Sequence, residues 1–175
     1  VSELRLQNWE PGHDLTFVKN YFDAKEADRI DAEYFQPKYD EIYNIIRRYN
    51  HGFDCLENLV EIRDDNYQPE DNKIYNYIEL SDIGNNGEII NHAQAIGLDL
   101  PSRARRMVKN KDLIVSSIEG SLDKIAIIPQ EHDSSLCSTG FFVIHSDKIE
   151  IEVLFIFLKT VAGLLQLKRS CSGTI

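Results

Sequence analysis

Apolar residues recur with two different periods along the chain, and the change of period predicts its helices and strands. Residues 37–49 carry apolar side chains three and four positions apart, which predicts a helix, and Pro37 suits its first turn. Residues 150–167 repeat that spacing and predict a second helix. Helix-forming residues at 23–35, before Pro37, add a shorter helical stretch. Between these ends, short apolar runs separated by polar turns predict strands.

The middle of the chain contains five or six short runs that we expect to be strands. The segment 56–62 predicts a turn of helix leading into a strand, and the alternating segment 74–80 predicts a longer strand after a polar loop at 64–73. Glycine and asparagine accept positive φ at little cost, so Gly84-Asn85-Asn86-Gly87 predicts a turn, with a short strand at 88–91 completing a hairpin. The remaining strands are expected at 112–118, at 124–128 and after the Ser-Thr-Gly-Phe step at 138–141.

Helices at both ends around such a middle favour an α+β fold over a regular βαβ array. We expect a small mixed or antiparallel β-sheet core flanked by helices. The chain has 175 residues, of which 42% are hydrophobic and 27% charged, which fits one domain with a packed core and some attached material.

The net charge of −10 is spread unevenly. Residues 1–72 hold 17 acidic and 8 basic side chains, whereas residues 73–175 hold 12 and 11. The first part should repel nucleic acid, while the second carries the one concentrated basic patch. The overall acidity therefore argues mildly against DNA binding, and the local pattern leaves it open.

Cysteine usage and hydropathy indicate the compartment. Cys55, Cys137 and Cys171 are far apart and fit no metal-binding spacing, which favours reduced thiols in a cytosolic protein. The longest apolar run, 153–158, is far shorter than the ~20 residues that span a bilayer, and the chain shows no signal-peptide pattern. We expect a soluble, cytoplasmic protein with no membrane partner.

Motifs typical of catalysis are missing. The sequence contains no GxGxxG after a strand, no GxxxxGK[ST] and no HExxH. Asp112 and Glu119 are candidate Mg²⁺ ligands of a nuclease, but Ser121 stands where such a site usually has lysine, and solvated loop acids are the alternative.

A thiol nucleophile is the other catalytic alternative. Cys137 would act with His132 or His145 as its base, whereas a lone cysteine in a strand is more often a small core residue. We therefore predict no catalytic residue, no cofactor and no metal.

The densest basic cluster of the chain follows Pro101-Ser102 and is the best candidate for a binding site. Arginine forks bridge phosphates or read guanine edges with two hydrogen bonds, although a solvated charged connection is the alternative on composition alone. The polar loop 119–123 and the turn 84–87 add hydroxyl and amide donors. The predicted DNA-binding residues are Arg103, Arg105, Arg106, Lys109, Lys111, Ser121, Lys124, Asn85 and Asn86.

Seven stretches, in family order, resemble the target-recognition domain of the specificity subunit of a type I restriction–modification system. They match its opening segment, its early strands, its "P-S-x-A" lead-in, its "VKxGDILxS" strand, its "STGF" segment and its final helix with a "GTI" loop. Lys111 stands where that strand usually has glycine. The stretches are 29–39, 59–62, 77–83, 100–106, 108–117, 136–143, and 154–158 followed by Ser172-Gly173-Thr174-Ile175.

The resemblance implies a non-catalytic, sequence-specific reader of duplex DNA that recognises one half of a split target, mainly in the major groove. The expected partners are double-stranded DNA, the methyltransferase (modification) subunits and, through the complex, the restriction (translocase) subunit. Residues 1–28, with Asn8-Trp9-Glu10-Pro11, are expected to form the joint after a preceding half. Residues 29–175 would be the recognition domain, a fragment ending before the long spacer helix.

Two other functions stay open. The chain could be the recognition domain of a fused type II restriction–methyltransferase enzyme, whose catalytic motifs would lie upstream of Val1. It could also be a protein-interaction domain that has lost DNA binding, which the charge of −10 favours.

Overall fold

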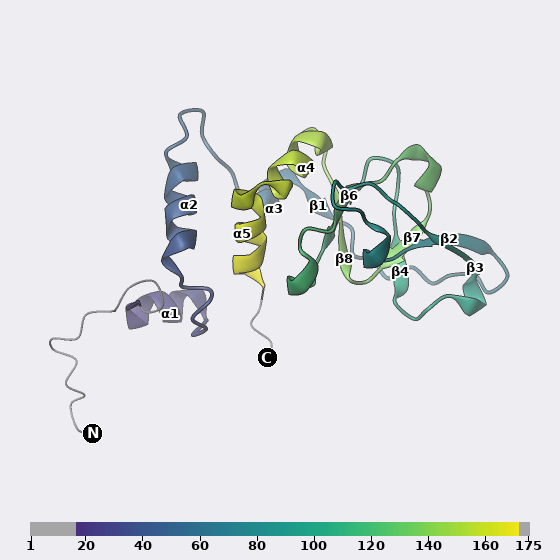
Figure 1. The fold of residues 1–175 in the computed structure, drawn as a ribbon, viewed down its shortest axis with the longest axis horizontal. Helices are drawn as coiled ribbons and strands as arrows, with labels where there is room; N and C mark the ends of the chain where they lie inside the picture. The colour runs from purple at the N-terminus through teal and green to yellow at the C-terminus, as the bar shows by residue number, and fades with distance from the viewer. Residues whose placement is uncertain (1–16, 172–175) are drawn as a thin grey trace, which may run out of the picture. The chain divides into compact units, whose positions relative to one another are not determined.

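The computed structural model describes residues 17–171, which fall into two compact units, 17–51 and 52–171 (Figure 1). The predicted joint at Asn8-Trp9-Glu10-Pro11 and the loop Ser172-Gly173-Thr174-Ile175 lie outside the described residues. The predicted domain boundary at 28/29 stays a prediction. No helix in the described part of the chain is long and apolar enough to cross a membrane.

Two helices make up the described part of the first unit. Helix α1 (Tyr21–Ala27) begins where the Asn20 side chain accepts a hydrogen bond from a first-turn N–H, and it ends at Asp28, whose φ of 50° is left-handed. Helix α2 (Pro37–Arg47) starts at the predicted proline and stops slightly before the predicted end. Of its apolar stripe, only Tyr39 is buried.

The second unit contains two four-stranded sheets, where one small sheet was expected, and the predicted α+β class is confirmed. In the first sheet the order is β1-β8-β5-β6 and every pair is antiparallel. In the second the order is β3-β2-β7-β4, and β2 and β7 are parallel. The strands are β1 (Glu61–Ile62), β2 (Ile74–Ile78), β3 (Ala93–Ile96), β4 (Ala104–Met107), β5 (Leu113–Ser116), β6 (Ile125–Ile127), β7 (Leu136–Ser138) and β8 (Phe141–His145).

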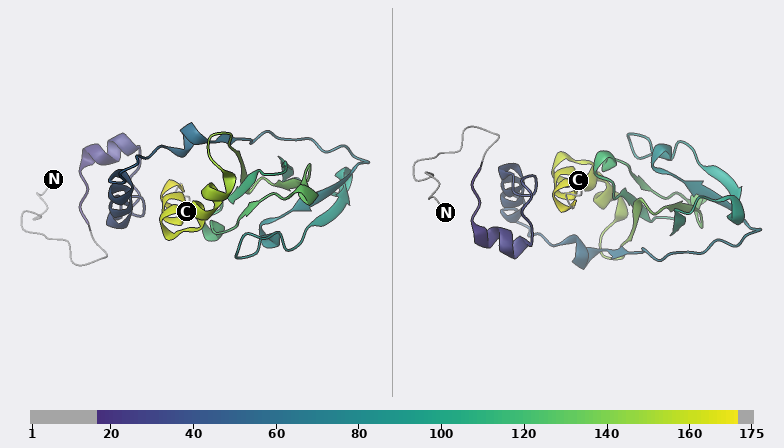
Figure 2. Two further views of the ribbon diagram at one scale, coloured as in Figure 1. Left: turned by 90° about the horizontal axis from the view of Figure 1, so that it is seen from above. Right: turned by 90° about the horizontal axis from the view of Figure 1, so that it is seen from below.

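Helices occupy the ends of this unit and several of its connections. The α-helices are α3 (Leu56–Leu59), α4 (Ile151–Lys159) and α5 (Val161–Ser170). The 3₁₀ turns are η1 (Leu80–Asp82), η2 (Gly97–Asp99), η3 (Glu119–Ser121) and η4 (Gln130–His132). Figures 1 and 2 show α4 and α5 beside the first sheet, with the second sheet farther along the unit.

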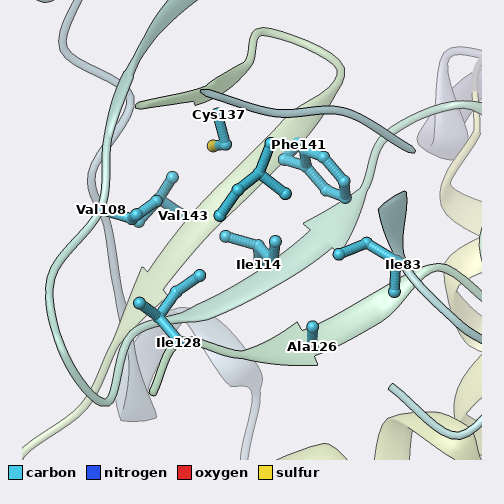
Figure 3. Packing of buried hydrophobic residues seen from close by; sticks show 9 residues of the cluster. Ile83, Val108, Ile114, Ala126, Ile128, Cys137, Phe141 and Val143 are labelled. Atoms are coloured by element: carbon cyan, nitrogen blue, oxygen red, sulfur yellow. The ribbon is translucent and has the colours of Figure 1, made fainter. Parts of the chain in front are cut away.

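The two sheets share a core, and strand β5 lies at its centre. Ile114 contributes to the cluster in Figure 3, where side chains from both sheets, among them Cys137 and Val143, point toward one another. Its neighbours Leu113 and Val115 join the cluster that includes buried residues of α4. Because alternate residues of a strand face opposite sides, a strand covered on both faces is apolar throughout.

The predicted hairpin after β2 differs from the observed one. The turn at 84–87 forms, but the expected strand at 88–91 is reduced to a single bridge between Ile83 and Ile89. The strand that pairs with β2 is instead β3. Its sequence, Ala-Gln-Ala-Ile, has no buried residue and is poor in β-branched residues, so it lacks the pattern typical of strands.

The long helix predicted at 150–167 is two helices. Thr160 has an extended backbone, with φ −73° and ψ 159°, and its Oγ1 accepts a hydrogen bond from Gly163 N at 3.1 Å, which caps α5. Gly163 is buried, and an added Cβ would lie 2.7 Å from Leu158 Cα. Because Gly163 has no Cβ, the start of α5 can pack closely against Leu158 of α4 just after the break.

Candidate nucleic-acid interface

Two lysines join the loop 119–124 to the turn 84–87. Lys124 Nζ donates hydrogen bonds to Ile83 O at 2.9 Å and to Asn85 Oδ1 at 3.5 Å. Lys159 Nζ donates to Asn85 O at 2.8 Å and to Asp123 O at 2.9 Å. The predicted site residues on the turn and on the loop are therefore neighbours, although they are far apart in sequence. Much of the donor capacity of Lys124 is used within the protein.

The predicted donors of these two segments differ in availability. Asn85 and Asn86 are exposed. Ser121 is half-buried, and its Oγ lies 3.1 Å from Ser116 Oγ and 3.4 Å from Ile118 O. Ser121 thus fixes the shape of the loop, while the two asparagines face solvent.

Arg103, immediately before β4, is held by two side chains of the β2 segment. Its Nε donates to Tyr77 Oη at 3.1 Å, and its Nη2 donates to Glu79 Oε1 at 2.7 Å. The hydrogen bond to Glu79, followed by that to Tyr77, raises the pKa of Arg103. Burial raises the pKa of Tyr77, so its hydroxyl stays neutral and can accept this bond. The Arg103 side chain remains 57% exposed.

A hollow of about 370 Å³ lies beside Arg103. Backbone hydrogen bonds build it, because Thr139 N donates to Arg103 O at 2.9 Å and Ser117 N donates to Gly140 O at 2.9 Å. The β7–β8 turn, the start of β4 and the loop after β5 therefore meet at one place. The hollow is lined by Glu79, Leu80, Arg103, Ile118, Ser138, Thr139 and Gly140.

Arg105 and Arg106, the two central arginines of the basic cluster, lie within strand β4, a strand that the sequence pattern did not predict. A register shift between Ala104 and Arg106 interrupts the pairing with β7, and Arg106 lies opposite Cys137. The Arg106 side chain is 16% exposed, with Nη1 3.9 Å from Asp64 Oδ2. Arg105 is half-buried, and no described residue hydrogen-bonds its side chain.

Lys109 and Lys111 are exposed at the opposite end of β5 from the loop 119–124. Lys111 has a φ of 67°, so the residue found where the family usually has glycine keeps the left-handed turn. Lys109 N donates to Asp112 Oδ2 at 2.8 Å, which closes this turn. Strand β5, whose four residues span about 13 Å, therefore separates Lys109 and Lys111 from Ser121 and Lys124.

The nuclease alternative fails on geometry. Asp112 and Glu119 lie beyond opposite ends of β5. Asp112 is fully buried, and its Oδ1 contacts Arg63 Nη1 at 3.1 Å and His145 Nδ1 at 3.3 Å. Residues 17–171 contain no cluster of three His, Cys, Asp or Glu side chains able to hold a metal ion.

The thiol alternative fails on burial. Cys137 is fully buried, and this burial raises its pKa to about 12, so the thiol is not activated as a nucleophile. His145 is paired with Asp112, and the ring of His132 lies 5.0 Å from that of His92.

Sequence reasoning missed Tyr77 and Glu79. Each contacts Arg103 across more than twenty residues of sequence, and neither carries a motif for this role. Because the backbone stays extended from β2 to Glu79, Tyr77 and Glu79 lie on one side of it, which was a usable signal only once the pairing of β2 was known.

No protein-family profile and no curated protein matches the chain. Among solved structures, it is similar to a chain described for the complex assembly and conformational transition of the type I R-M system, with a TM-score of 0.52 and 27% identity over 58% of this chain and 30% of that one. It is also similar to the HsdS subunit from Thermoanaerobacter tengcongensis, with a TM-score of 0.51 and 29% identity over 55% of this chain and 26% of the other. Each match spans less than a third of the neighbour's length. Over more than half its length the chain therefore resembles, in fold and in sequence, the HsdS specificity subunits of type I restriction–modification systems, as the sequence stretches predicted.

Proposed function

We propose that this chain is a sequence-specific reader of duplex DNA, acting as a specificity subunit of a type I restriction–modification complex. It reads one half of a split target and carries no catalytic site of its own. The observation that carries this proposal is the meeting of three segments around Arg103, on a fold that resembles HsdS. Loops held on a rigid sheet suit the reading of base edges, because their side chains keep fixed positions.

The charge distribution supports base reading with few phosphate contacts. Arg103 is paired with Glu79, Arg106 is largely buried, and Lys124 donates to the protein itself. Lys109 and Lys111 are the exposed members of the predicted cluster that are best placed to meet a phosphate backbone. We therefore expect a moderate salt dependence, since each neutralised phosphate contributes about −0.9 to the slope of log K against log salt.

In the complete system, methyltransferase subunits and a restriction (translocase) subunit would act where this chain binds, in the cytoplasm. The methyltransferase subunits would methylate adenine, and this chain would determine the DNA sequence at which the complex binds. Residues 29–175 would form the recognition domain, with residues 1–28 as the joint to a preceding half.

Selection on randomised duplex DNA at low salt, followed by a salt titration of the enriched sequences, tests this function. Enrichment of one short motif with affinity falling in salt is the expected result. Binding without enrichment would leave only attraction to the backbone and would contradict sequence reading. No binding at all would favour the protein-interaction alternative. Catalytic motifs in the same reading frame would favour the fused type II enzyme.

A further inference from the structure

The guanidinium of Arg103 has one edge committed to the protein and one edge free. Arginine carries five N–H donors in a fixed plane. One on Nε is taken by Tyr77, and one on Nη2 by Glu79. The other three, two on Nη1 and one on Nη2, have no hydrogen-bond acceptor among the described residues. With the side chain 57% exposed, the free Nη1–Nη2 edge offers two parallel donors.

This arginine is fixed before any ligand arrives. Tyr77 is buried to 2% exposure in the middle of its sheet, and the Arg103 backbone is held by the hydrogen bond from Thr139 N. Glu79 is itself held, because its carboxylate accepts a hydrogen bond from the backbone N–H of Asp82 while Asp82 accepts one from Glu79 N. A ligand that binds at the free edge therefore has little side-chain motion left to freeze out, and this low entropic cost favours a specific contact.

The acidic neighbour makes a phosphate a poor ligand. A phosphate at the free edge would bring a second anion close to the Glu79 carboxylate, whose Oε1 lies 2.7 Å from Arg103 Nη2. A phosphate on the same guanidinium would be a near neighbour of this carboxylate, and the two negative charges would repel each other, which solvent at the protein surface screens only in part. A base edge carries no net charge, so it gains the two hydrogen bonds without that repulsion.

The pattern of donors selects one base. In the major groove guanine presents two acceptors, N7 and O6, whereas adenine presents an acceptor beside a donor, thymine one acceptor and cytosine a donor. Two parallel donors match guanine. On the basis of the proposed DNA-reading function, we propose that Arg103 reads a guanine of the target half-site, donating from Nη1 and Nη2 to its O6 and N7, with Tyr77 and Glu79 as positioning residues.

The test is selection by the 175-residue chain and its variants on the same randomised duplex DNA, with salt titrations of each. The motif selected by the wild-type chain should contain a guanine. Arg103→Ala should reduce the preference for this guanine by about 5- to 150-fold, while the salt slope stays unchanged. Arg103→Met, which keeps the apolar stem, should do the same. Lys109→Ala is the matched control. It should make the salt slope shallower by about 0.9 and leave the motif intact.

Glu79→Gln distinguishes positioning from a structural role. It keeps an acceptor for Nη2 and removes the charge that repels phosphate. The guanine preference should weaken and the salt slope should steepen by up to about 0.9, which a loss of folding alone would not produce.

Three results would overturn the assignment of Arg103. They are a motif that survives both Arg103 variants, a uniform loss of affinity with a shallower salt slope, and a preference for a base other than guanine at the affected position. A wild-type chain that enriches no motif would overturn the proposed function, and this inference with it.

Discussion

The buried carboxylate of Asp112 makes the sharpest stability prediction. Its side chain is fully buried, with Oδ1 3.1 Å from Arg63 Nη1 and 3.3 Å from His145 Nδ1, while Oδ2 accepts from Lys109 N at 2.8 Å. Asp112→Asn keeps the shape and an acceptor for Lys109 N, but it removes the charge that Arg63 faces. The turn before β5 is therefore expected to survive while the ion pair is lost.

The size of the expected loss of stability depends on how far water can solvate the Arg63 charge once its partner is gone. Breaking a buried ion pair costs about 3–5 kcal/mol when the remaining charge stays buried. The Arg63 side chain is 28% exposed, so water recovers part of that cost. We expect Asp112→Asn to lower the free energy of unfolding by about 2–3 kcal/mol, and the melting temperature by roughly 8 °C or more.

Urea and thermal denaturation measure this directly, and Asp147→Asn is the matched control. Asp147 also contacts His145, at 3.3 Å from Nε2, but its side chain is 93% exposed. Its substitution should leave stability within experimental error. If the two substitutions cost the same, burial does not set the strength of the Asp112 contacts and the reasoning is refuted. The double variant with Arg63→Met should lose less than the sum of the single variants, because each removes the same pair.

Four further substitutions or measurements test other features of the fold. Lys111→Gly should raise the free energy of unfolding by about 0.5–1 kcal/mol in urea denaturation, because Lys111 has a φ of 67°, and a loss would show that its side chain is needed. Gly163→Ala should destabilise by about 2 kcal/mol or more, because its Cβ would meet the Leu158 backbone at 2.7 Å; an unchanged melting temperature would mean that α5 moves freely. The Cys137 thiol, with its pKa raised to about 12, should react with iodoacetamide at pH 8 only on unfolding, while exposed Cys55 reacts at once, and rapid labelling of both would contradict the burial. Burial and then His92 lower the pKa of His132, so the unfolded chain binds its proton more readily and stability should fall as the pH drops below about 6.5; this loss should be smaller in His132→Gln.

Local patterns predicted what local physics determines. Pro37 starts a helix, the glycines and asparagines at 84–87 make a turn, and the apolar run around Ile114 becomes the most buried strand. Each of these depends on a few neighbouring residues, and so each can be read along the chain.

The misses have a common cause, which is that partners distant in sequence decide the outcome. Arg105 and Arg106 of the basic cluster became part of strand β4 because β7 pairs with it, and the pairing turned Arg106 inward opposite Cys137. Strand β3 formed on β2 although its residues have little strand preference. The fixed edge of Arg103 depends on Tyr77 and Glu79, which no spacing rule connects to it. The helix break at Thr160 could have been suspected from Thr160 and Gly163, since threonine caps helices and glycine weakens their interiors.

The parallel pairing of β2 with β7 has a consequence for how the chain acquires its structure during synthesis. β7 lies between β2 and β4 and continues directly into β8, which is a central strand of the other sheet. Before residues 136–145 emerge from the ribosome, β2 has only β3 as a neighbour, β5 has only β6, and neither sheet can be completed. Non-local pairings of this kind are slow to form, because the entropic cost of closing the intervening chain comes before any stabilising contact forms. Pulse proteolysis of chains ending near 135 and near 171 should find the shorter one unprotected. Folding of the β-rich unit is then a single late event, in which one short segment completes both sheets at once.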